Sequence, residues 1–187
     1  DRMQKYAYVL IKEMQKNPKY KDVITDEFVA DVTAATPLHD IGKIGIPDKV
    51  LLKPGKLTEQ EYDVIKTHTL IGDETLDNVV NTFGDNTFLQ VGKKIVRSHH
   101  ERPDGTGYPD GLKGDEIPIE ASVMAIADVY DALRTKKVYK PAISHEKAIE
   151  IIKNGKGTQF LADAVDAFLN VEKVFAYIWL EYETMCS

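Results

Sequence analysis

Apolar residues recur every three or four positions along most of the chain, and this spacing constrains the fold more than any other feature. Met3, Tyr6 and Leu10 would share one face of a helix, with lysines on the opposite side. Thr58 and Glu61 form a capping box, which predicts that another helix begins there. No stretch of useful length alternates with the period of a strand, and no internal repeat is evident. We therefore predict an all-α fold.

The predicted helices are separated by turn residues. The first is expected to end near Asn17, and the second to follow an N-cap at Thr25 and carry an apolar stripe that reaches His39. Residues 46–55 are expected to form a loop, and Tyr62 of the third helix is expected to face inward. The remaining helices are predicted over residues 73–81, 87–101, 119–134, 145–153 and 162–182.

One segment is unsuited to a helix. Residues 103–114 contain four glycines and two prolines, which predicts an irregular loop near 103–118. A length of 187 residues suits one domain, so we predict a single helical bundle over residues 1–187. Residues 171–183 are expected to be an extension that caps the core or pairs with a partner in a homodimer. The chain begins at Asp1 inside a helical pattern, so we expect it to be an N-terminally truncated part of a longer protein.

Composition excludes several classes of protein. The net charge is −6 and no broad basic face is evident, which argues against general nucleic-acid binding. No apolar run approaches the ~20 residues that a membrane-spanning helix needs. The single cysteine, Cys186, excludes a disulfide framework and favours a cytoplasmic setting.

The placement of the histidines carries the chemical information. Four of the five lie at or near the ends of predicted helices, on inward faces; they are His39, which precedes Asp40, then His68, and the pair His99-His100. Asp128 adds a carboxylate within an apolar run, where burial is costly unless the charge is paired or bound to a cation. Any one of these could be a hydrogen-bonded core residue. Together they form a ligand set suited to iron, manganese, zinc, nickel or copper. The fifth histidine, His145, follows Ser144 at a helix start and is expected to lie on the surface.

Two motifs resemble those of a known family. Residues 39–43, His-Asp-Ile-Gly-Lys, reproduce an HD motif, and residues 99–109 match the pattern HHExxDGxGYP. Segments 53–58, 66–72 and 127–133 match in order and spacing, so the resemblance covers roughly residues 2–170. The chain is identified as a member of the HD-GYP family, the cyclic di-GMP phosphodiesterases of the HD superfamily. This resemblance implies a single HD-type helical bundle.

The resemblance also implies a metal centre. Its ligands would be His39, Asp40, His68, His99, His100 and Asp128. Asp40 would bridge two ions, with His39 and Asp128 on one ion and the other three histidines on the second. The implied cofactors are two or three divalent ions, with iron or manganese favoured over zinc, nickel or copper. A third ion would require ligands that precede Asp1.

Further residues are implied to contact the substrate. Lys43 would reach the phosphate over the metal site and act in catalysis with Asp40, and Lys137 and Lys140 match basic positions of the family. Lys137 stands where the family usually has an arginine, so it keeps the charge but loses the bidentate fork. Tyr108 either contacts the substrate or only belongs to a turn that orients His99 and His100.

The implied activity is hydrolysis of cyclic di-GMP to the linear dinucleotide pGpG, to GMP, or to both. Two alternatives stay open: a phosphodiesterase for cyclic GMP-AMP, and a non-catalytic signalling module that binds a cyclic dinucleotide. The lysine at position 137, where the family usually has an arginine, motivates the second alternative. A hydrolase of ordinary nucleotides is disfavoured by the segment 99–114, which such relatives lack. Members of this family commonly carry a receiver or sensor domain upstream, and the resemblance implies one here.

Overall fold

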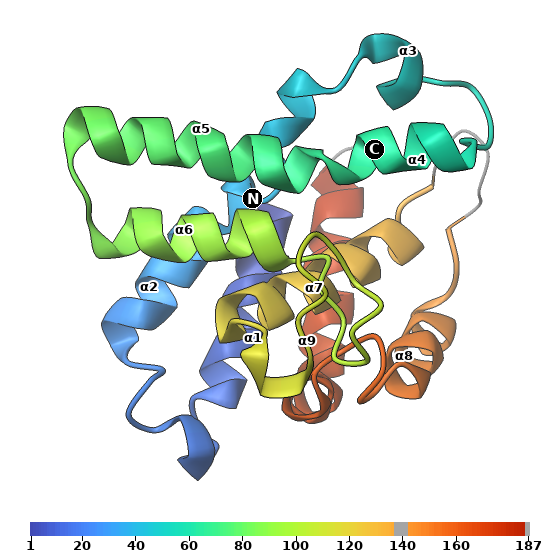
Figure 1. The fold of residues 1–187 in the computed structure, drawn as a ribbon. Coiled ribbons are helices and arrows are strands. Elements are labelled where there is room, and N and C mark those ends of the chain that lie inside the picture. Colours follow the sequence, from blue (N-terminus) through green and yellow to red (C-terminus); the bar gives the residue numbers. More distant parts are fainter. Residues whose placement is uncertain (137–141, 186–187) are drawn as a thin grey trace.

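The computed structural model describes residues 1–136 and 142–185, and these form helices joined by turns, without a β-strand (Figure 1). The all-α prediction is confirmed for this part of the chain. The α-helices are α1 (Arg2–Met14), α2 (Asp26–Ala35), α3 (Asp48–Leu51), α4 (Glu59–Lys66), α5 (His68–Phe83), α6 (Thr87–Ser98), α7 (Ile119–Arg134), α8 (His145–Asn154) and α9 (Ala162–Met185). Short 3₁₀ turns occupy Pro18–Tyr20, Thr36–Leu38, Ile41–Gly45 and Gly114–Glu116.

The main core lies where α1, α7, α8 and α9 meet, and aromatic rings dominate it. The ring of Tyr6 stacks on Phe175 with centroids 4.6 Å apart, and Tyr130 meets both rings edge-on at 5.4 and 5.2 Å. Burial of one such ring stabilises the fold by roughly 1.5–3 kcal/mol. Because Phe175 belongs to the second half of α9, residues 171–183 pack into this core as a continuation of one long helix.

A second layer is the antiparallel pair α5 and α6, which lie side by side and pack against α2 and the turn Ile41–Gly45 (Figure 1). Two glycines allow a very close approach here. A Cβ on Gly42 would lie 1.9 Å from the carbonyl oxygen of His68, and a Cβ on Gly72 would lie 2.4 Å from a methyl of Val96. Only glycine permits such contact. The turn that carries Asp40 is thereby pressed against the start of α5.

Several local predictions differ from the structure. The second helix ends at Ala35, before His39, because Pro37 has no N–H to donate to the carbonyl of Thr33. That carbonyl instead accepts a hydrogen bond from Gln4 at 3.3 Å. The helix predicted over 73–81 begins earlier, at His68, and continues through Gly72.

Two further differences concern residues 46–66, which precede α5 in the chain. Residues 46–55 include the short helix α3, where only a loop was predicted. The prediction that Tyr62 faces inward is wrong: α4 has no fully buried residue, and Tyr62 keeps 49% of its surface exposed.

The irregular segment 103–118 is confirmed, interrupted by the turn Gly114–Glu116. Within residues 1–136 and 142–185, no helix is both long and apolar enough to cross a membrane.

Candidate metal centre

Four residues from three separate places in the chain converge between the two layers. Asp40 precedes the turn Ile41–Gly45, His68 begins α5, and His99 and His100 directly follow α6. Each offers one ligand atom, and these atoms all lie within 4.8 Å of one another. The sequence prediction that these residues meet at one point is confirmed.

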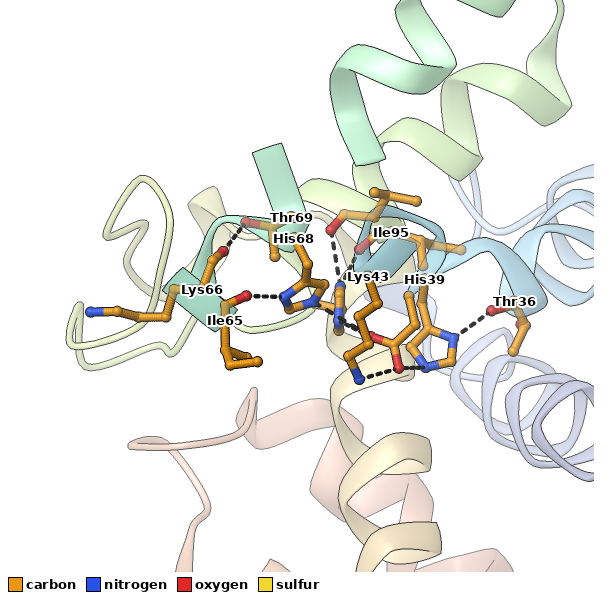
Figure 2. A network of polar contacts seen from close by, with 11 residues as sticks. Thr36, His39, Lys43, Ile65, Lys66, His68, Thr69 and Ile95 are labelled. Carbon is orange, nitrogen blue, oxygen red and sulfur yellow. Dashed lines mark hydrogen bonds and ion pairs between the residues drawn. The ribbon is translucent and has the colours of Figure 1, made fainter. Parts of the chain in front are cut away.

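The histidine rings are oriented by the backbone (Figure 2). In His39, His68 and His99 the Nδ1 atom lies at hydrogen-bond distance from a main-chain carbonyl oxygen. The acceptors are Thr36 at 2.9 Å, Ile65 at 2.7 Å and Ile95 at 2.9 Å. Because a carbonyl can only accept, Nδ1 carries the proton in all three rings, and in His68 and His99 the Nε2 atom then presents a lone pair. Metal-ligating histidines are commonly fixed in this way.

The inward-facing atoms have no hydrogen-bond partner among the described residues. These atoms are Asp40 Oδ1, His68 Nε2 and His99 Nε2. Asp40 Oδ1 lies 3.4 Å from His68 Nε2 and 4.0 Å from His99 Nε2. A buried polar atom without a partner costs roughly 1–3 kcal/mol. A cation between them would satisfy all three, and imidazole with carboxylate is a donor set that transition metals accept.

The protonation states agree with metal binding. Burial lowers the pKa of His68, and burial together with the neighbouring imidazoles lowers that of His99. Burial lowers the pKa of His100 to about 3. Burial alone would raise the pKa of the Asp40 carboxyl, but His39 and Lys43 outweigh it and hold the pKa below its usual range. Neutral imidazoles around an ionised carboxylate are the form that binds a metal.

His39 and Asp128 lie beside this group of four rather than within it. His39 Nε2 is 3.3 Å from the other carboxylate oxygen of Asp40. Asp128, on α7, lines a cavity of about 250 Å³ together with His99 and His100. Burial by itself would lower the pKa of His39. The hydrogen bond to Asp40 and the charge of Asp40 outweigh burial, and the charge of Asp128 adds to them, so the pKa is raised overall. His39 therefore contacts Asp40 directly, and Asp128 lies at the adjoining cavity.

Lys43 reaches the same carboxylate. Its Nζ lies 2.5 Å from Asp40 Oδ2, and the side chain remains partly exposed. The ammonium therefore lies at the edge of the cluster, where an anion approaching from solvent would meet it. Lys137 and Lys140, the other predicted basic contacts, lie outside the described residues.

A buried carboxylate holds the glycine-rich loop, residues 103–114, next to the cluster. Glu101 is only 3% exposed, and its oxygens accept hydrogen bonds from the main-chain N–H groups of residues 110–112 at 2.7 to 3.1 Å. A Cβ on Gly107 would lie 2.3 Å from the nitrogen of Arg102, so the loop doubles back tightly. Tyr108 is thereby stacked on His100, with ring centroids 4.8 Å apart.

Glu101 was not singled out from the sequence. The available signal was its position, an acid directly between two histidines and a run of glycines whose N–H groups need acceptors.

The expectation that His145 lies on the surface is wrong. Its side chain is 17% exposed, its Nδ1 is 2.9 Å from the hydroxyl of Tyr130, and its Nε2 is 2.5 Å from Glu172. The first turn of α8 packs between α7 and α9, which supply these two partners.

The fold and the cluster define a helical protein with a buried histidine–aspartate centre of the composition and geometry of a divalent-metal site. A family model described as "HD domain" matches residues 5–163, so the chain belongs to the HD domain family.

Individual relatives agree. A cyclic di-GMP phosphodiesterase of Vibrio cholerae serotype O1 is 46% identical over 177 residues, which is 95% of this chain and 36% of the relative. The cyclic di-GMP phosphodiesterase response regulator RpfG of Xanthomonas campestris pv. campestris is 49% identical over 146 residues, 78% of this chain and 37% of the relative. The chain thus spans less than two fifths of these relatives.

Among solved structures, Bd1817, a HDG"Y"P protein from Bdellovibrio bacteriovorus, superposes with a TM-score of 0.61. The match covers 91% of this chain and 51% of that one at 18% identity, which shows a shared fold. Together with the motifs at 39–43 and 99–109, these findings confirm the predicted resemblance to the HD-GYP family.

Proposed function

We propose that this chain is a metal-dependent phosphodiesterase domain that hydrolyses cyclic di-GMP to pGpG, to GMP, or to both. The observation that carries the proposal is the cluster of Asp40, His68, His99 and His100, with its buried, unpartnered ligand atoms. Relatives named as cyclic di-GMP phosphodiesterases, similar over most of this chain, support the choice of substrate.

We assign the metal ligands as His39, Asp40, His68, His99, His100 and Asp128. Asp40 has one oxygen facing His68 and His99 and the other facing His39, which suits a carboxylate that bridges two ions. Two ions, or three with ligands from elsewhere, are proposed, and iron or manganese suits the mixture of imidazole and carboxylate. When bound, such ions supply an activated water and neutralise the charge on phosphate oxygens.

The chain's own residues would position the substrate around that centre. Lys43 would place its ammonium against a phosphate oxygen and offset the charge that develops there or on the departing ribose 3′-oxygen. Backbone carbonyls hold the imidazoles as Nδ1–H tautomers, so the ligand nitrogens need no reorientation when the substrate arrives. Tyr108, held by the loop, would form one wall beside the phosphate. Burial is the main cause that raises the pKa of the Tyr108 phenol above its ordinary value, so the hydroxyl stays protonated and can donate a hydrogen bond.

The direct test is turnover. The protein would be purified, loaded with manganese or iron, and incubated with cyclic di-GMP and, side by side, with cyclic GMP-AMP. Chromatography should detect pGpG or GMP from cyclic di-GMP at the higher rate. Folded, metal-loaded protein that produces neither over hours would defeat the proposal, and tight binding without product would favour a non-catalytic signalling module.

We infer a cytoplasmic protein in which residues 1–187 are one domain, with a receiver or sensor domain upstream. Lys137 and Lys140 are assigned to substrate binding on the basis of the sequence pattern alone.

A further inference from the structure

The cavity next to the metal centre extends well beyond the ligands. It is about 250 Å³ in volume, and His99, His100 and Asp128 form only one end. Its apolar floor is made by Ala125 and Val129 of α7. A phosphate diester bound at the cluster would project its nucleoside into this space, because it is the cavity that the ligands themselves line.

The outer wall is aromatic. Tyr62, on α4, lines the cavity and meets Tyr108 edge-on, with centroids 6.4 Å apart and ring planes at 84°. Tyr108 already has one face against His100, so the aromatic with the greater open surface is Tyr62, which is 49% exposed. The ammonium of Lys66 lies 5.5 Å from the Tyr62 centroid and is paired with Asp63, which helps to fix the ring.

The exposure of Tyr62 has no explanation in the packing of the fold. No residue of α4 is fully buried, so this ring does not anchor the helix to a core. Hydrogen-bonding groups of Arg102 and Gln159 line the same cavity. An aromatic wall with polar groups nearby is the combination that holds a nucleobase by stacking and by contacts to its edge.

We propose that Tyr62 is a specificity-determining residue whose ring stacks on a purine base of the substrate in a subsite formed with Tyr108, Arg102 and Gln159. This inference rests on the proposed function, since it names where that substrate's base would lie. Stacking of one base on an aromatic side chain corresponds to roughly a tenfold effect on binding.

The test compares four proteins: the parent, Tyr62→Ala, Tyr62→Phe and Tyr8→Ala. Tyr8 is a matched control because it is also 49% exposed but lies on α1, in a groove lined by α1 and α9 residues. Each manganese-loaded protein would be assayed with cyclic di-GMP and with methyl p-nitrophenyl phosphate, a diester without a base. Calorimetry on the metal-free proteins in chelator, where the substrate is not consumed, would give the Kd for cyclic di-GMP independently of turnover.

We expect Tyr62→Ala to raise KM and Kd for cyclic di-GMP about tenfold, with less than a twofold change for the base-free diester. Tyr62→Phe should restore both values, and Tyr8→Ala should match the parent. Equal losses on both substrates, or no change on either, would overturn the subsite. A parent protein that binds cyclic di-GMP through Tyr62 without cutting it would defeat the hydrolase and leave the subsite standing. A parent that cleaves only the base-free diester and does not bind cyclic di-GMP would overturn both.

Discussion

His99 and His145 are both largely buried imidazoles at helix ends, yet their surroundings differ in one respect. Both ring nitrogens of His145 have partners, the hydroxyl of Tyr130 and the carboxylate of Glu172. His99 has a backbone carbonyl on Nδ1, and its Nε2 is buried without a hydrogen bond. His68 repeats the second pattern. A satisfied histidine holds a fold together, whereas a set of unsatisfied ones pointing at a single carboxylate is prepared for a cation.

The largest effect should come from the carboxylate at the centre of the unsatisfied region. Asp40→Ala removes the carboxylate whose two oxygens face His68 and His39, so we expect turnover to fall more than about 100-fold, beyond the loss typical of residues that only orient ligands. In the parent, manganese at 100 times its Kd should stabilise the fold by about 2.7 kcal/mol. That corresponds to a rise in Tm of roughly 5–10 °C, which Asp40→Ala should abolish.

Thermal melts with and without manganese would measure this rise, with Asp166→Ala, an exposed carboxylate paired with Lys156, as the control. An Asp40→Ala protein that still gains the full rise would show that the bridge is assigned to the wrong residue.

The next effect is on pH dependence. Burial lowers the pKa of His100 to about 3, against about 6.5 in an unfolded chain. Between these values the unfolded chain takes up a proton that the folded chain refuses, so the free energy of unfolding falls as the pH falls. We expect a loss of up to about 1.4 kcal/mol per pH unit from this group in metal-free protein. Urea melts in chelator from pH 7 to pH 4 would measure the slope, and His100→Gln should flatten it. An unchanged slope in His100→Gln would contradict the burial of this imidazole.

Matched substitutions then separate the two kinds of histidine. His145→Leu leaves the hydroxyl of Tyr130 and the carboxylate of Glu172 without this partner, so the free energy of unfolding should fall by about 1–3 kcal/mol. Metal content should stay at the parental value. Denaturant melts and elemental analysis of the same sample would test both statements. A loss of metal in this variant would mean that the two regions are coupled.

His68→Leu should have the smallest effect on stability and the opposite effect on metal. The substitution removes a buried Nε2 that has no partner, and this gain offsets the loss of the hydrogen bond from Nδ1 to the carbonyl oxygen of Ile65. We expect metal-free protein to change by less than about 1 kcal/mol while metal affinity falls at least tenfold. Chemical denaturation in chelator and competition with a metal indicator would check this pair of results. A large loss of stability without metal would place His68 in the same structural category as His145.

Sequence reasoning succeeded where spacing along the chain carries the information. The helical period predicted most of the helices. The motifs at 39–43 and 99–109, with the matching segment 66–72, pointed to Asp40, His68, His99 and His100, which the fold does bring together. It failed for Tyr62 and His145. Periodicity reports which face of a helix a residue occupies, but not whether another element covers that face.

The sequence by itself determined the helices, their capping and the ligand-rich helix ends, because hydrogen bonding and apolar periodicity act between near neighbours. The tertiary structure decided which histidines gather around Asp40 and which became structural. The contact of Gly42 with the start of α5 brings Asp40 to His68, while the packing of α8 between α7 and α9 gives His145 both of its partners. These outcomes depend on contacts between residues distant in the chain, which no local pattern encodes.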